Sequence, residues 1–136
     1  MRFCNQKIET QKTFHTLVGM RNNQKMGALG MISDQTPTAA STRHWMTFLN
    51  QDTPVLVGAE QLARRFDYPV IFGDVNRSKR GYYRCEFILL SDNPKAASEF
   101  EITEKYMQLL EAKINKSPEY WLWSHKRWKH KKPENL

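Results

Sequence analysis

Apolar residues recur at helical spacing in three stretches of the chain. The first predicts a short helix over 10–23. The second predicts a helix over 54–66, in which Thr53 is expected to cap and Pro54 to fill the first helical position. The third predicts a helix over 103–116. The apolar positions that define these stripes are Phe14, Leu17 and Val18, then Leu56, Ala59, Leu62, Ala63 and Phe66, then Ile102, Tyr106, Leu109, Leu110 and Ile114.

Shorter apolar runs between these stretches predict strands. The run 26–32 ends abruptly in polar residues and is expected to be a buried strand. The runs 69–75 and 82–90 flank the polar turn 76–81, so we expect an antiparallel hairpin with a loop longer than the tightest turns. Residues 35–42 have the composition of a loop. The two-residue period of a strand places four side chains on one face of the hairpin: Tyr83, Cys85, Phe87 and Leu89.

This order of elements predicts an α/β fold in which helices cover a mixed sheet. No repeat or low-complexity linker interrupts the 136 residues, so 1–136 is expected to form a single domain. No apolar run approaches the roughly 20 residues of a membrane-spanning helix, and the first residues lack a signal-peptide pattern. Cys4 and Cys85 are too few for a disulfide framework, which favours a reducing compartment.

The net charge of +7 is concentrated near the end of the chain. Residues 125–132 contain five Lys or Arg and no acid, whereas the remainder carries 16 basic and 14 acidic residues. The basic aromatic tail, defined here as residues 118–136, also contains Trp121, Trp123 and Trp128. Three interpretations are open: tryptophans in the core with a solvated basic face, contact with an anionic membrane, or binding of nucleic acid.

The chain lacks the common local signatures of catalysis. It has no glycine-rich phosphate loop, no G-x-S-x-G elbow and no H-E-x-x-H, and its four histidines do not form a ligand set, so neither a metal nor a cofactor is expected. Asp34 is the best single candidate, because it follows the predicted strand 26–32 and the carboxyl ends of strands face binding crevices. With Gln35 it could orient a hydroxyl or hold a basic partner; alternatively, Asp34 caps the following turn.

The tail resembles the end of the lipid A biosynthesis (lauroyl/myristoyl) acyltransferases, which close with a P-E-x-x-x-W-x-H-x-R-x-K pattern. The D-Q pair at Asp34 and Gln35 is similar to another element of that family, and 44–50 resembles its next block. The resemblance covers nearly the whole chain and implies the C-terminal half of a glycerolipid acyltransferase-like fold. The matching tail positions are Pro118, Glu119, Trp123, His125, Arg127 and Lys129.

One departure from the family bears on activity. The family uses an H-x-x-x-x-D/E motif, whose histidine deprotonates the acceptor hydroxyl while the acid orients the imidazole. The residues five positions after the four histidines are Met20, Leu49, His130 and Asn135, so the motif is absent. The family's N-terminal membrane segment is absent too. We therefore expect a partial acyltransferase domain that has no catalytic residue of its own and is inactive alone.

The resemblance implies two anionic partners, acyl-acyl carrier protein and a phosphorylated lipid A precursor. It also implies a peripheral location on the anionic cytoplasmic face of the bacterial inner membrane, and no nucleic acid. The residues expected to bind substrate are Arg2, Asp34, Gln35, His125, Arg127 and Lys129. For the tail residues a packing role is the alternative, with Trp123 buried and His125 hydrogen-bonded inside. A basic aromatic module that binds nucleic acid or membrane without catalysis is the competing function.

Overall fold

The computed structural model describes residues 7–133, so the predicted substrate contact Arg2 lies outside the described residues, as does Cys4. Clustering of contacts divides the chain into two compact units, 1–31 and 32–136. The first unit contains a 3₁₀ turn (Thr10–Lys12) followed by helix α1 (Thr13–Asn22), which confirms the predicted helix over 10–23.

The predicted strand over 26–32 is wrong. These residues form neither helix nor strand, and the side chains of Met26 and Ile32 are 97% and 76% exposed. A strand needs a hydrogen-bonded neighbour, and none of the described strands pairs with this run. Gly27 and Gly30 also add no side chain to pack and raise the entropic cost of ordering the segment.

The second unit begins with two elements that differ from the helix expected over 54–66. Strand β1 (His44–Phe48) pairs antiparallel with strand β2 (Gln51–Val55), and helix α2 (Gly58–Phe66) starts only afterwards. Pro54 therefore lies in a strand. This is physically allowed because β2 has a single partner strand, so the missing N–H of proline costs no ladder bond on the open edge.

The turn between β1 and β2 is two residues long. Leu49 and Asn50 both have positive φ, 50° and 59°, as the favoured two-residue hairpin turns require. Asparagine tolerates this conformation, but leucine rarely adopts it. The Leu49 N–H donates to Oε1 of Glu111 over 2.7 Å, and this charged hydrogen bond holds the strained residue against the last helix.

The predicted hairpin and the predicted last helix are both confirmed. Strand β3 (Val70–Lys79) pairs antiparallel with strand β4 (Tyr82–Ser91), and helix α3 (Glu101–Lys116) follows. The loop is shorter than expected: it contains only Arg80 and Gly81, and Gly81 takes a φ of +80° that its missing Cβ permits. Two further 3₁₀ turns occupy Ala39–Ser41 and Pro118–Tyr120.

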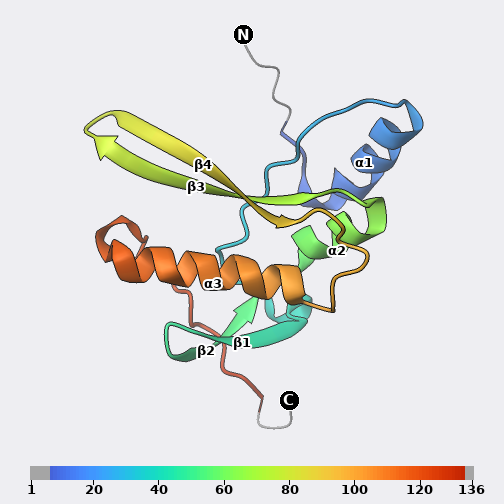
Figure 1. Cartoon of the computed structure of the whole chain (residues 1–136). Coiled ribbons are helices and arrows are strands. Elements are labelled where there is room, and N and C mark those ends of the chain that lie inside the picture. The colour runs from blue at the N-terminus through green and yellow to red at the C-terminus, as the bar shows by residue number, and fades with distance from the viewer. Residues whose placement is uncertain (1–6, 134–136) are drawn as a thin grey trace. The chain divides into compact units, whose positions relative to one another are not determined.

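Helix α3 lies between the two strand pairs (Figure 1). The β1–β2 pair covers one side of the helix, and the β3–β4 hairpin runs along the other. The structure thus confirms the α/β class, with its strands in two separate antiparallel pairs. The hydrophobic core lies between α3 and the β1–β2 pair, and its buried members are Phe48, Val55, Val57, Met107, Leu110 and Ile114.

Candidate functional site

Arg127 is buried, with 1% of its surface exposed. Its Nη1 donates to the carbonyl of Pro54 in β2 over 2.8 Å, and its guanidinium carbon lies 5.9 Å from the centre of the Phe48 ring. Two other nitrogens, Nε and Nη2, are buried without a hydrogen-bond partner in the described part of the chain. Buried polar atoms are nearly always hydrogen-bonded, so this spare donor capacity sets the site apart from ordinary packing.

Thr36 joins the segment after Gln35 to the C-terminal tail. Its backbone N–H donates to Nε2 of His125 over 3.3 Å, and its hydroxyl donates to the carbonyl of Arg127 over 2.7 Å. These partners are separated by 89 and 91 positions in the sequence. The structure therefore brings the D-Q element and the tail together, although their separation in sequence gives no sign of it.

Asp34 is close enough to Arg127 and Tyr106 for its charge to act on both. Burial lowers the pKa of the Arg127 guanidinium, and the carboxylate of Asp34 opposes that shift. Burial also raises the pKa of the Tyr106 hydroxyl, and Asp34 raises it further. Tyr106 is therefore a neutral phenol near pH 7, and Asp34 supplies the negative charge that favours a buried cation.

The position of Asp34 differs from the expected one. No strand precedes it, so its predicted place at the carboxyl end of a strand is wrong, for the reason given for residues 26–32. Asp34 is half-buried and Gln35 is exposed. The side chain of Asp34 makes no hydrogen bond to any described residue, so the alternative of a turn cap is not seen either. Its carboxylate is left available to a ligand.

The tail packs against β1 and β2 through Trp121 and Trp128. Trp128 donates from Nε1 to Oγ1 of Thr53 over 2.8 Å, and Trp121 meets the Phe48 ring edge-on at 6.3 Å between centroids. Trp123 is 55% exposed, so the alternative in which it is buried is not seen. Its Nε1 instead donates to a nearby carbonyl within the tail, which lets the ring lie on the surface. Lys129 is exposed beside this packed segment.

His44 and Glu104 form a pair that the sequence did not reveal. Nε2 of His44 lies 2.8 Å from Oε1 of Glu104, and the imidazole stacks on the ring of Phe100 at 4.2 Å between centroids. The pair joins β1 to α3 across 60 positions, and no local spacing signals it. A carboxylate that orients an imidazole is one feature of a general base, so His44 is the histidine against which the expected inactivity is tested.

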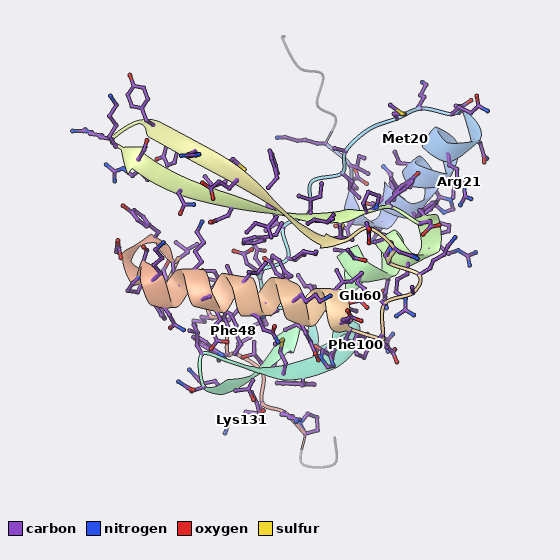
Figure 2. The ribbon with its side chains drawn as sticks, in the orientation of Figure 1. Met20, Arg21, Phe48, Glu60, Phe100 and Lys131 are labelled. Atoms are coloured by element: carbon purple, nitrogen blue, oxygen red, sulfur yellow. The ribbon has the colours of Figure 1, made fainter. Side chains whose placement is uncertain are left out.

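An open cleft of about 440 Å³ adjoins this pair at the start of α3. Phe100 lines the cleft and also stacks on His44. Figure 2 shows Glu60 and Phe100 close together near that end of the helix, with Phe48 farther along it. Both ends of the Glu60 carboxylate are engaged, since Oε2 accepts two hydrogen bonds from Thr103 and Oε1 lies 3.7 Å from Arg64. Glu60 therefore supports α3 through Oε2, while Oε1 makes only a long ion pair with Arg64.

Two features are not found among the described residues. No group of three or more metal-ligating side chains comes together within residues 7–133. Over the same residues, no helix combines the length and apolar character that crossing a bilayer requires.

Comparison with known proteins identifies a protein family. The model of the family described as bacterial lipid A biosynthesis acyltransferase matches residues 1–130, nearly the whole chain. Neither the curated proteins nor the solved structures yielded a match. The matched range contains the D-Q pair, the block around His44 and the tail through His130, so every segment used above falls within it.

Proposed function

Because this chain belongs to the bacterial lipid A biosynthesis acyltransferase family, we propose that it serves the transfer of a fatty acyl chain from acyl carrier protein to a hydroxyl of a lipid A precursor. The family match supports acyl transfer as the general activity. The two specific substrates and a peripheral location at the cytoplasmic face of the bacterial inner membrane are parts of the proposal. Both substrates are anionic, which suits the basic tail.

The acceptor glycolipid is proposed to bind where the D-Q element meets the tail. The observation that carries this is the buried Arg127, whose Nε and Nη2 have no partner among the described residues. Both nitrogens are buried, so the acceptor would reach them only where the tail moves away from β2; an anionic oxygen would then satisfy them, because guanidinium nitrogens pair well with phosphate oxygens. The carboxylate of Asp34, whose charge acts on Arg127, can accept a hydrogen bond from a sugar hydroxyl. The full proposed contact set is Arg2, Asp34, Gln35, His125, Arg127 and Lys129.

Lys129 provides the test of this surface that disturbs packing least. Replacing the exposed Lys129 with glutamine is expected to weaken binding of a bisphosphorylated glucosamine disaccharide about two- to fivefold, the loss typical of one solvent-exposed ion pair. Titration calorimetry at moderate salt measures the change. Lys132→Gln is the matched control, because Lys132 is an equally exposed lysine of the same tail outside the family pattern. Equal losses in both variants would show that only the total charge of the tail matters.

The chain is proposed to lack activity alone, because its sequence contains no H-x-x-x-x-D/E motif. Incubation with acyl-acyl carrier protein and a tetra-acylated acceptor should give no turnover above a blank without protein. The His44–Glu104 pair provides the decisive second arm, since it is an imidazole held by a carboxylate. Turnover that His44→Asn abolishes and His15→Asn leaves intact would overturn the proposed inactivity and assign the base to His44.

A further inference from the structure

The β3–β4 hairpin has one face attached to α3. The ring of Phe72 meets that of Tyr106 at 5.6 Å between centroids, and Asp74 forms an ion pair with Lys113. Nζ of Lys113 also donates to the carbonyl of Val75 over 2.6 Å. These contacts hold the hairpin along α3. The opposite face of the hairpin therefore points away from the helix.

The other face is apolar and exposed. The register pairs Ile71 with Leu89, Gly73 with Phe87, Val75 with Cys85 and Arg77 with Tyr83, so these side chains lie on the same face. We call five of them the apolar hairpin face. Their exposed fractions are 55% for Ile71, 53% for Val75, 69% for Tyr83, 76% for Phe87 and 59% for Leu89. Five large apolar side chains gathered on one rigid surface are typical of an interaction site.

The end of the same hairpin is cationic. Residues 76–84 contain four Lys or Arg and no acid. Among these, Lys79 lies 4.3 Å from the centre of the Tyr82 ring, and Arg84 lies 3.3 Å from Glu86. Two tyrosines, Tyr82 and Tyr83, stand next to these cations and are exposed. The hairpin thus combines an apolar face, two exposed tyrosines and three cations, Arg77, Lys79 and Arg80, that form no ion pair with a described residue.

We propose that the apolar hairpin face and its cationic end dock on an anionic lipid bilayer. Apolar side chains enter the acyl boundary, tyrosines prefer the headgroup layer, and lysine and arginine meet anionic headgroups, so each part of the hairpin has a matching layer of the membrane. A second copy of this chain is a less suitable partner, because it would bring another cationic hairpin end and no anionic surface to meet residues 76–84. The choice of a bilayer as partner rests on the membrane location included in the proposed function.

The basic aromatic tail is the competing membrane contact. It carries more charge, but the Trp128 indole is hydrogen-bonded to Thr53 of β2, and Arg127 is assigned above to the acceptor and not to the bilayer. Its exposed apolar side chains, among them Leu122 and Trp123, do not lie on a regular face as those of the hairpin do. The two surfaces can be separated by substitution, because their cations are exposed and far apart in sequence.

Vesicle sedimentation of the full chain tests the proposal. The double variant Lys79→Gln/Arg80→Gln is expected to bind phosphatidylglycerol vesicles about twenty-five-fold more weakly than wild type, at roughly fivefold per cation. Lys131→Gln/Lys132→Gln, the matched variant of the tail, is expected to bind as wild type. Tyr83→Ser/Phe87→Ser should also lose binding, and neutral phosphatidylcholine vesicles should bind none of the proteins. An unchanged melting temperature confirms that each variant is folded.

A second measurement places the hairpin at the lipid directly. In Phe87→Trp, brominated phosphatidylglycerol is expected to quench fluorescence more than in wild type, whose tryptophans all lie outside the hairpin. Loss of binding in the tail variant with retention in the hairpin variants would overturn the proposal. So would a concentration-dependent dimer that Phe87→Ser dissociates, because the face would then belong to a second copy. Failure of vesicle binding with intact binding of the phosphorylated disaccharide would refute this inference and leave the proposed acceptor surface standing.

Discussion

Replacing Phe48 with alanine is expected to lower the free energy of unfolding by about 3–5 kcal/mol. Phe48 has no exposed surface and lies at the end of β1, and it belongs to the same buried core as Val55 of β2 and Met107 of α3. Truncation removes its transfer free energy and leaves a cavity that three different elements line, so the site cannot collapse easily. Urea denaturation followed by far-UV circular dichroism measures the change.

Phe87→Ala is the matched control for this prediction. It deletes the same atoms from a side chain that is 76% exposed, so the free energy of unfolding should change by no more than about 0.5 kcal/mol. Phe48→Ala should also loosen the tail, because Trp121 and Arg127 both contact the Phe48 ring. A loss below about 1 kcal/mol for Phe48→Ala would contradict the placement of the core between α3 and the β1–β2 pair.

The second large effect is expected at Glu60. Its replacement by alanine should lower the free energy of unfolding by about 2–4 kcal/mol. Oε2 of Glu60 accepts from the backbone N–H of Thr103 over 2.9 Å and from its hydroxyl over 2.7 Å. Both residues are buried, with 3% and 6% of their surfaces exposed. Thr103 lies in the first turn of α3, where backbone N–H groups have no partner within the helix, so the carboxylate supplies a cap from α2.

Two variants separate this effect from a general change of charge. Glu99→Ala removes an exposed carboxylate from the same cleft and is expected to be nearly neutral. Glu60→Gln keeps an acceptor oxygen and loses the charge, so its cost should lie between those of the two alanine variants. Thermal or urea unfolding distinguishes the three. Equal stability of Glu60→Ala and Glu99→Ala would show that Thr103 finds another acceptor and that the cap is dispensable.

The elements predicted correctly are those whose pattern is local. The β3–β4 hairpin and α3 each carry a complete periodic stripe, and a nearby turn or a proline marks their limits. The helix over 54–66 was begun too early because Thr53-Pro54 has the composition of a helix start. The Thr53 hydroxyl instead bonds to the carbonyl of Gln51 and accepts from Trp128, a partner 75 positions away. Secondary-structure propensities do not predict such a tertiary contact.

In the candidate site, too, the local sequence identifies residues but does not identify their tertiary contacts. Asp34, His125 and Arg127 could be named from the family pattern, but that pattern carries no information on which of them touch. Thr36, the residue that joins the two segments, has no distinguishing feature in the sequence. The His44–Glu104 pair was missed for a related reason: a spacing rule finds an acid five residues after a histidine, and this acid comes from another element.

The attachment of the tail to β2 determines how its charge can be studied. Cutting the chain before His125 would discard the positive residues, but it would also strip Thr53 and Pro54 of the indole and guanidinium donors that cover them. In a shortened protein, the effect of losing the positive charges could therefore not be separated from the effect of partial unfolding. Neutralising single lysines leaves those covers in place, so point substitution, and not deletion, is the sound way to measure what the charge contributes.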